Sequence, residues 1–413
     1  MTRPDLSAIR SRFPSLAREM DGRPVVFADA PGGSQVPEAV IEAMSGYLRR
    51  SNANAHGAFT TSQETDDVIA GAHRAAADLL NADPDEVIFG PNATTLLLAI
   101  SRSVGRTLSP GDEVVVTRLD HDANVRPWVL AAEDAGATVR WVDLRVDDVT
   151  LDVDSFAAVL TERTKVVAFT LASNAVGTVT PAADLTRLVR ERTGAIVACD
   201  GVHVAQHRGI DVRAIGADLV ACSPYKIFGP HLGIVFGRRE LLTSLRPYKV
   251  RPAGDEPPDA FETGTQNHEA FAGWIAAVDS LAGLAADDAG HRRRRLADAF
   301  ERTIVPYEAE LSKRFLDGIA SIPGVRLFGI AGADRVHERT PTFAIRVGDR
   351  HPAETAKALA ERGVYVWDGN YYALELMERL GLEQTGGAVR IGFCHYNTEA
   401  EVDRVLEELA VLA

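Results

Sequence analysis

Cysteine is scarce in this chain: three thiols, Cys199, Cys222 and Cys394, occur among 413 residues. No two of them have the spacing of a disulfide framework or a zinc site, so we expect a reducing compartment and no metal. Long apolar runs are absent as well, and the first residues lack the apolar core of a secretory signal. The sequence therefore predicts a cytoplasmic protein without a membrane span.

Positive charge is outweighed by negative charge. Lys and Arg together number 44, Asp and Glu number 58, and the formal net charge is −14. Such an excess of acid repels phosphate backbones and argues against nucleic acid as a partner. Hydrophobic residues make up 46% and charged residues 25%, which is typical of a globular protein with a large core.

The order of apolar runs predicts the fold class. Short runs at 114–118, 138–142, 166–172, 195–199, 218–222 and 233–237 alternate with helical patterns, which favours an α/β fold with a mostly parallel sheet. After residue 264 a long helical stretch is followed by three strand-like runs and a C-terminal amphipathic helix, as in a small α+β domain. We expect a large domain at 15–265 and a small one from 1–14 and 266–413.

Lysine is also rare, with five residues, at positions 165, 226, 249, 313 and 357. Lys226 follows a hydrophobic strand and precedes a Gly/Pro-rich stretch that leads into another strand. A lysine amine held at a strand end and partly desolvated is the usual carrier of a Schiff base. A turn lysine that reaches solvent is the alternative interpretation of this segment alone.

Two further segments strengthen the Schiff-base interpretation. Asp200 ends a strand of small apolar residues, at the edge where doubly wound sheets bind ligands, and its carboxylate can hold the pyridine nitrogen of pyridoxal phosphate (PLP). Upstream, Gly-Pro-Asn-Ala-Thr-Thr at 90–95 opens a helical run and can bind phosphate. Each segment alone is more often a simple cap. In the order phosphate turn, acid, lysine, they predict a PLP enzyme.

These segments, with several others, resemble the class V aminotransferases and, within that family, the cysteine desulfurase-like branch. The additional matches are the segments at 120–124, 173–178, 261–267 and 389–393. The resemblance covers nearly the whole chain. It implies the PLP-dependent transferase fold type I, with a large domain built on a seven-stranded, mostly parallel sheet, and a homodimer with shared active sites.

The resemblance also implies a role for each matched residue. It assigns catalysis to Lys226, to His121, which would stack on the PLP ring, and to Tyr372. The expected PLP contacts come from the phosphate turn, the strand ends and a loop offered to the partner subunit: Ala93, Thr94, His121, Asn174, Asp200, His203, Ser223, Tyr225, Lys226 and Thr265. The expected substrate contacts are Arg390, which would clamp the α-carboxylate, Asn174, Gly32 and His56. For Gly32 a tight turn is an equal alternative.

One departure from the family pattern bears on the chemistry. Desulfurases carry a nucleophilic cysteine on a mobile loop, in a Gly-His-His-Cys-Ala pattern, and this chain has Gly-Asn-Tyr-Tyr-Ala at 369–373. Tyr372 stands at the thiol position, and a phenol cannot accept sulfane sulfur as a persulfide. Cys394 lies four residues past Arg390 and could face the site, although core packing is the default for such a cysteine.

We therefore expect a PLP-dependent lyase or transferase that acts on a small L-amino acid. It would cleave a Cβ substituent through an enamine, by β-decarboxylation of aspartate or desulfination of cysteine sulfinate. The segments at 225–233 and 395–398 also resemble the decarboxylative aldolase of ustiloxin biosynthesis, which implies that an aldehyde co-substrate could capture the enamine. A cysteine desulfurase or lyase that releases alanine or pyruvate, an aminotransferase and an epimerase are the alternatives.

Overall fold

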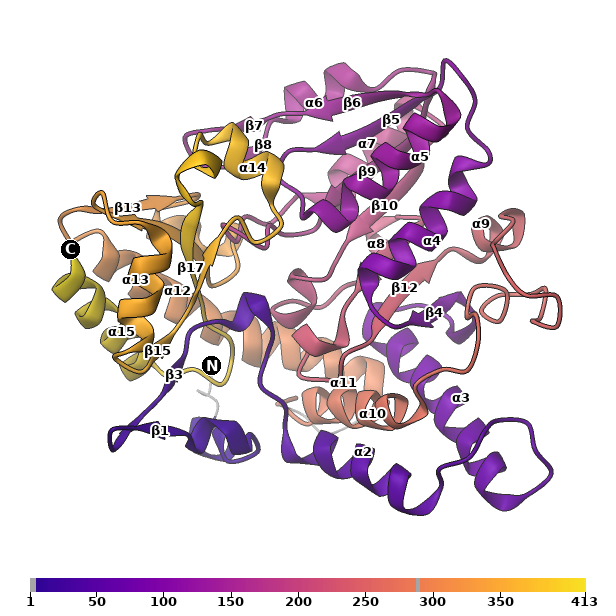
Figure 1. Cartoon of the computed structure of the whole chain (residues 1–413), viewed down its shortest axis with the longest axis horizontal. Coiled ribbons are helices and arrows are strands. Elements are labelled where there is room, and N and C mark those ends of the chain that lie inside the picture. Colours follow the sequence, from indigo (N-terminus) through magenta and orange to yellow (C-terminus); the bar gives the residue numbers. More distant parts are fainter. Residues whose placement is uncertain (1–4, 287–289) are drawn as a thin grey trace.

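A computed structural model describes residues 5–286 and 290–413 of the chain (Figure 1). Residues 1–4 and 287–289, which the sequence analysis assigned to the small domain, lie outside the described residues. No helix in the described ranges has both the length and the apolar character needed to cross a bilayer.

The larger sheet has seven strands in the order β4-β12-β11-β10-β9-β5-β6. Every neighbouring pair from β11 to β6 is parallel, whereas β12 runs antiparallel to both β11 and β4. This arrangement confirms the predicted α/β class with a mostly parallel sheet. The strand bounds are β4 (Val87–Gly90), β5 (Glu113–Thr117), β6 (Thr138–Val142), β9 (Thr164–Thr170), β10 (Ile196–Asp200), β11 (Leu219–Cys222) and β12 (Gly233–Gly237).

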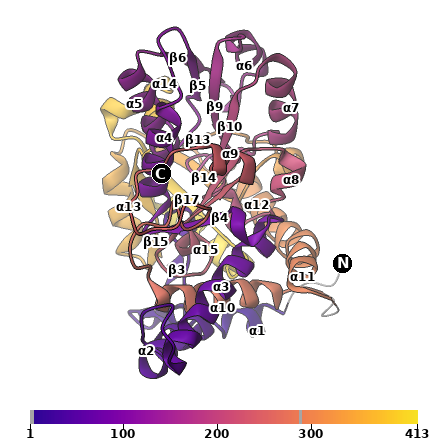
Figure 2. The same cartoon turned by 90° about the vertical axis from the view of Figure 1, so that its right-hand side faces the viewer.

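Both faces of this sheet are buried, which explains why its central strands read as continuous apolar runs. Alternate residues of one strand enter different layers: Val114 and Val116 pack in one hydrophobic cluster and Val115 in another. Figure 2 shows the sheet between α4 and α5 on one side and α6, α7 and α8 on the other. These helices are α4 (Ala93–Gly105), α5 (Arg126–Ala135), α6 (Val153–Val159), α7 (Ala182–Arg192) and α8 (Val212–Ile215).

The second part of the fold is a four-stranded antiparallel sheet in the order β13-β14-β17-β16. Helices α12, α13 and α15 cover it and share a hydrophobic cluster with it. The bounds are β13 (Val325–Phe328), β14 (Thr342–Val347), β16 (Trp367–Gly369), β17 (Ala388–Gly392), α12 (Val305–Ile319), α13 (Pro352–Ala360) and α15 (Glu399–Leu412).

Several contacts cross the expected domain boundaries. Strand β3 (Val26–Phe27) pairs in parallel with β15 (Val364–Tyr365), which ties an early segment to the small sheet. Helix α10 (His268–Ala282) packs along α2 (Glu38–Arg50) and α3 (Thr60–Leu80). The division at residues 14 and 265 stays a prediction.

The remaining elements are short or peripheral. They are α1 (Leu6–Arg10), β1 (Glu19–Met20), β2 (Arg23–Pro24), β7 (Leu144–Arg145), β8 (Thr150–Leu151), α9 (Arg239–Ser244), α11 (Arg292–Asp298) and α14 (Leu374–Arg379).

Candidate active site

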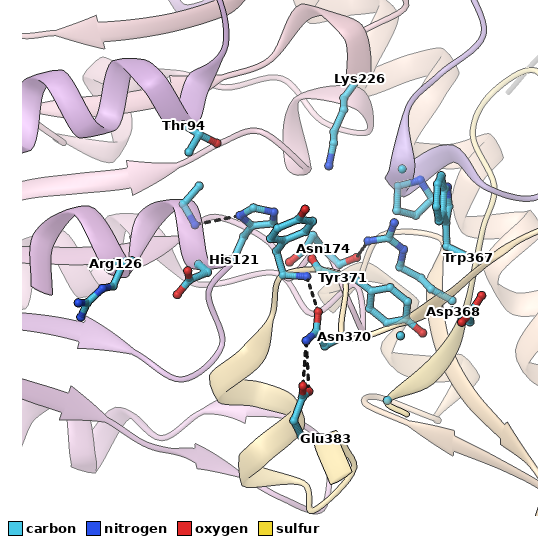
Figure 3. A pocket seen from close by; sticks show the side chains of 18 of the residues that line it. Thr94, His121, Arg126, Asn174, Lys226, Trp367, Asp368, Asn370, Tyr371 and Glu383 are labelled. Atoms are coloured by element: carbon cyan, nitrogen blue, oxygen red, sulfur yellow. Dashed lines mark hydrogen bonds between the residues drawn. The ribbon is translucent and has the colours of Figure 1, made fainter. Parts of the chain in front are cut away.

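A cavity of about 1030 Å³ opens where the C-terminal ends of the large sheet's parallel strands face the small sheet. Ligands of open α/β sheets bind at this edge. The cavity is lined by eight of the predicted site residues: Gly32, Thr94, His121, Asn174, Tyr225, Lys226, Tyr372 and Arg390. In Figure 3 the Lys226 side chain points into the space between His121 and Trp367.

Lys226 lies on a short 3₁₀ turn, Pro224–Lys226, directly after β11. Its side chain is buried, and desolvation followed by the charge of Arg390 lowers its pKa to about 7, while Asp200 acts in the opposite direction. A large fraction of the amine is therefore neutral at neutral pH. A neutral, buried amine is what Schiff-base formation and proton abstraction require.

Asp200 is the last residue of β10 and is 5% exposed. One oxygen, Oδ1, accepts the backbone N–H of Val202 at 2.8 Å. Burial raises the pKa of this carboxyl, and the Val202 hydrogen bond and the charge of Lys226 work against that rise. A buried carboxyl of this kind gains most from a cationic partner such as a protonated pyridine nitrogen.

His121 caps the turn Asp122–Asn124 that follows β5, and its Nδ1 accepts the Ala123 N–H at 3.0 Å. Desolvation, then the charges of Lys226 and Arg390, lowers the pKa of His121 to about 3. The ring is therefore neutral, with its proton on Nε2. It stacks on the Tyr372 ring at a centroid distance of 5.4 Å and an interplanar angle of 25°. A neutral, flat ring at this place suits stacking against an aromatic cofactor.

Arg390, on β17, is a buried cation that forms no ion pair with a carboxylate in the described part of the chain. Its Nη1 donates to the backbone oxygen of Asn174 at 3.0 Å, its guanidinium lies 4.5 Å from the Tyr371 ring centroid, and Nε has no partner. Burial lowers its pKa to about 10. A desolvated guanidinium with an open N–H is a receptor for a carboxylate.

Asn174 joins the two sheets across the cavity. Its Nδ2 donates to the backbone oxygen of Tyr371 at 2.9 Å, while its buried Oδ1 has no partner. A buried amide oxygen without a hydrogen bond is costly, so this atom is a candidate contact for a bound molecule.

The N-terminus of α4 forms another wall, to which Thr94 contributes. The Asn92 side chain caps the helix by accepting the Thr95 N–H at 2.8 Å. Strand β12 passes so close that a Cβ on Gly233 would lie 2.2 Å from the carbonyl carbon of Asn92, which only glycine avoids. The free N–H groups of the first turn give this end affinity for phosphate. Ala93 and Ser223 are buried near the starts of α4 and of the Lys226 turn, but neither lines the cavity.

Asp200, like Ala93 and Ser223, does not itself line the cavity, and three more predicted residues are absent from the lining. His203 is buried, with Nε2 at 3.0 Å from the Thr340 hydroxyl and 3.2 Å from that of Thr342. Thr265 is exposed after Gly264, whose φ is +76°. His56 is exposed on the loop between α2 and α3, with Nδ1 at 3.0 Å from Asp66 Oδ1.

The loop at the expected thiol position is tied to its surroundings. Tyr371 and Tyr372 have φ values of +55° and +58°. The Tyr372 N–H donates to Asn370 Oδ1 at 3.0 Å, and its backbone oxygen accepts the Asp122 N–H at 2.6 Å. The phenol itself is 72% exposed at the mouth of the cavity.

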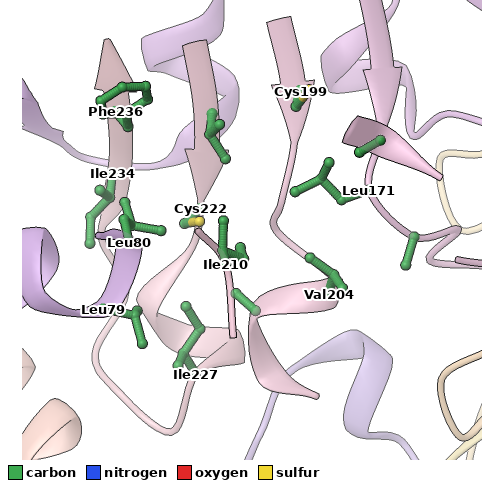
Figure 4. Packing of buried hydrophobic residues seen from close by; sticks show 14 of the residues in the cluster. Leu79, Leu80, Leu171, Cys199, Val204, Ile210, Cys222, Ile227, Ile234 and Phe236 are labelled. Atoms are coloured by element: carbon green, nitrogen blue, oxygen red, sulfur yellow. The ribbon is translucent and has the colours of Figure 1, made fainter. Parts of the chain in front are cut away.

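No cysteine lines the cavity. Cys199 and Cys222 face buried aliphatic side chains beneath the sheet (Figure 4), and Cys394 is fully buried. Burial raises the pKa of all three thiols. The alternative that Cys394 faces the site is wrong, because this side chain packs in the core.

Sequence reasoning missed Asp29 and Trp367, which adjoin the predicted residues. Trp367 packs on Gly32 so closely that a Cβ there would lie 2.2 Å from Nε1. Asp29 is half-buried with a buried, unpartnered Oδ1, and desolvation raises its pKa to about 6 against a backbone hydrogen bond and the charge of Arg390. The acid before the Ala-Pro-Gly-Gly turn was a usable signal for Asp29, whereas Trp367 gave none.

A mostly parallel seven-stranded sheet, a small antiparallel sheet, a buried lysine and aspartate and a half-buried histidine at their junction define a PLP-dependent enzyme of fold type I. Comparison with known proteins agrees. Residues 26–405 match the model of the class-V aminotransferases, and the chain belongs to this family. The unpartnered Oδ1 of Asn174, the neutral His121 ring and the N-terminus of α4 all fit the family's cofactor.

Individual relatives point to one branch of the family. The chain is 33% identical to a probable cysteine desulfurase of Streptomyces coelicolor, over 98% of this chain and 96% of the relative. It is 31% identical to an uncharacterized protein of Mycobacterium tuberculosis, over 99% of each. Among solved structures, an apo cysteine desulfurase of Thermococcus onnurineus superposes with a TM-score of 0.87 at 25% identity, over 100% of this chain and 98% of that one. The protein is a cysteine desulfurase-like PLP enzyme.

Proposed function

We propose that this enzyme releases an acidic β-substituent, a carboxyl or sulfinate group, from a small L-amino acid and leaves alanine. The observation that carries the proposal is the absence of a thiol from the cavity lining: Tyr372 stands at the family's cysteine position, and the described cysteines are all in the core. Conversion of cysteine to alanine requires a nucleophile that accepts the sulfane sulfur, whereas β-elimination of sulfide would give pyruvate instead. A β-carboxyl or β-sulfinate leaves by fragmentation and needs no thiol.

The groups around the cofactor site can perform the proton transfers of this reaction. When bound, PLP stabilises negative charge that develops on the substrate carbon. Lys226 would hold the cofactor and then move the proton at the substrate's Cα, for which a neutral amine is available at pH 7. Asp200 would keep the ring nitrogen protonated. His121, neutral and fixed by Ala123, would support the ring face.

Arg390 supports an amino-acid substrate. Its guanidinium is buried and has an unpartnered Nε, so a substrate α-carboxylate would satisfy both its charge and its open N–H. This contact would orient the Cα proton toward Lys226. It would also aim the β-substituent at the remaining lining residues near Tyr372.

The surroundings of that substituent favour the loss of charge. His121 is neutral, and the Arg126 guanidinium is engaged by Glu133 at 3.1 Å. A carboxylate without a cationic partner is poorly stabilised, and it gives up that charge when CO2 leaves. The bonding electrons stay on Cβ, which takes one proton to become the methyl group of alanine. The net change is aspartate plus a proton to alanine plus CO2, without oxidation or reduction.

An aldehyde would compete with the proton for the same carbon. We include this branch, a γ-hydroxy amino acid formed by C–C bond formation, in the proposal because the segments at 225–233 and 395–398 resemble a decarboxylative aldolase. The large cavity volume leaves room for a second small molecule beside the cofactor and substrate.

We further propose that two copies share their active sites. Thr265 and His56 are exposed and do not line the cavity of their own chain, although the family pattern assigns both to a site. A second copy that places its Thr265 near the N-terminus of α4 would add the remaining predicted contact to the cofactor phosphate. This role of Thr265 follows from the resemblance at 261–267.

The decisive test is a product analysis. Purified holoenzyme would be incubated with L-aspartate, L-cysteine sulfinate, L-cysteine or L-serine, each with and without an aldehyde, and the products identified by mass. Alanine from either of the first two substrates supports the proposal, and a γ-hydroxy amino acid supports the aldehyde branch. Alanine only from L-cysteine, together with a persulfide, would make the enzyme a desulfurase.

Two variants sharpen this test. Tyr372→Cys restores the family's thiol at its expected place, so it should gain persulfide formation with L-cysteine. Tyr372→Phe is the matched control, because it keeps the ring against His121 and supplies no nucleophile. If wild type and both variants form persulfide equally, the argument from Tyr372 fails.

A further inference from the structure

Strand β4 lies at the edge of the large sheet and has only β12 beside it. The N–H of Phe89 points away from β12, and an unpaired N–H inside the protein is unfavourable. The Glu262 carboxyl satisfies it: Oε1 accepts the Phe89 N–H at 2.7 Å. Glu262 thus takes the place of a missing strand, although it is 173 residues away in the sequence.

This contact lies next to the phosphate end of the active site. Phe89 and Gly90 end β4, Pro91 and Asn92 form the turn, and α4 begins at Ala93 with Thr94 in the cavity wall. In the other direction, Thr263, Gly264 and Thr265 follow Glu262 and are all exposed. Glu262 therefore attaches this exposed segment to β4 through a buried side chain.

The carboxyl of Glu262 has little to stabilise a negative charge. On α3, His73 Nε2 lies 3.0 Å from Oε1 without an aligned hydrogen bond, and both side chains are less than a tenth exposed. Burial raises the pKa of Glu262 to about 8; the Phe89 hydrogen bond works against this rise and the charge of Asp259 adds to it. Burial and the charge of Arg74 lower the pKa of His73 to about 4. At pH 7 both groups are neutral, and β4 contributes only its N–H.

We propose that Glu262 is a positioning residue for cofactor binding, because it fixes the edge of β4, and with it the turn into α4, to the segment that carries Thr265. This inference concerns retention of the cofactor and does not depend on which β-substituent leaves. Ionised Glu262 would be a buried charge without a cationic partner. The segment from Glu262 to Thr265 would then move away from β4 to hydrate this charge, and the affinity for the cofactor phosphate would fall.

The test compares wild type with Glu262→Gln and Glu262→Ala. PLP would be titrated into each apoprotein between pH 6.5 and 9.5, with the Kd read from absorbance and thermal unfolding measured in parallel. At pH 7 the Gln variant, whose amide oxygen still accepts the Phe89 N–H, should bind PLP within about twofold of wild type. The Ala variant should bind at least about tenfold more weakly, by the loss of one buried hydrogen bond.

The pH profile separates positioning from simple packing. Wild-type affinity should fall as pH rises through about 8, the pKa of Glu262, beyond any fall seen in the Gln variant, which cannot ionise. The charge of Asp259 raises the pKa of Glu262. Asp259→Asn removes that charge, so the additional loss of affinity should begin at lower pH than in wild type. The inference is overturned if Gln and wild type have the same profile, or if Gln binds as weakly as Ala. If Ala does not fold, the comparison of wild type, Gln and Asp259→Asn still decides.

Discussion

Removal of every thiol tests the proposed chemistry most directly. The perturbation is the triple substitution Cys199→Ala, Cys222→Ala, Cys394→Ala. If the β-substituent leaves by fragmentation, no sulfur atom takes part, and turnover of the best acidic substrate should stay within about twofold of wild type. A desulfurase mechanism would lose all activity.

The expected cost is in stability, because each sulfur is buried in the main hydrophobic cluster. Deletion of one buried heavy atom costs about 1 kcal/mol, so the three together cost about 3 kcal/mol if they act independently. Cys199 and Cys222 lie on adjacent parallel strands, so those two effects could couple. At about 2 cal/mol/K of unfolding entropy per residue, a chain of 413 residues loses about 1 °C of Tm per kcal/mol, so Tm should fall by roughly 3–4 °C.

The assay is product formation at 25 °C, well below the lowered Tm, with the PLP absorbance as the check on folding. The three single variants are the controls. If Cys394→Ala alone abolishes turnover while the fold and the PLP band remain intact, the enzyme has a relocated nucleophile, and the reasoning from Tyr372 is refuted.

Three other predictions concern the cofactor, the substrate and the assembly. Borohydride reduction followed by peptide mapping should place the pyridoxyl group on Lys226, and a label on Lys249 or Lys165 would contradict this. The rate of PLP incorporation into the apoprotein should increase as pH rises through about 7, because the lowered pKa of Lys226 makes its neutral amine available there. Arg390→Lys should raise KM for the amino acid about 10- to 100-fold, the loss of a bidentate charge-assisted contact worth about 1.5–3 kcal/mol, with a smaller change in kcat. Light scattering should report a dimer, and Thr265→Ala should weaken PLP binding; an active, PLP-loaded monomer would exclude shared sites.

The fold class and the central residues were readable from the sequence for local reasons. Asp200 and Lys226 each follow a short run of buried strand residues, and parallel strands bring their C-terminal ends to one edge. Asn92 and the residues after it have the pattern of a helix N-terminus, and the structure forms that cap. These features depend on neighbours in the sequence, so a single chain was enough to predict them.

Contacts between residues far apart in the chain could not be predicted from the sequence. His203 follows the Asp200 motif, yet its Nε2 contacts the hydroxyls of Thr340 and Thr342, and the residue does not line the cavity. Trp367 joins the site because its ring packs on Gly32. Both placements depend on how the small sheet meets the large one, which no local pattern encodes. The parallel pairing of β3 with β15 is of the same kind.

The loop of Tyr372 connects the missing thiol to the proposed reaction. A non-glycine residue in the left-handed region costs about 1–2 kcal/mol, and this loop has two in succession, Tyr371 and Tyr372. The backbone hydrogen bonds to Asn370, Asp122 and Asn174 hold it there. A thiol that receives sulfur must later deliver it elsewhere, which favours a loop that can move. Release of CO2 or sulfinate sulfur needs no carrier, so a loop fixed in a strained conformation can serve as a wall that keeps Tyr372 over His121 while the small product leaves.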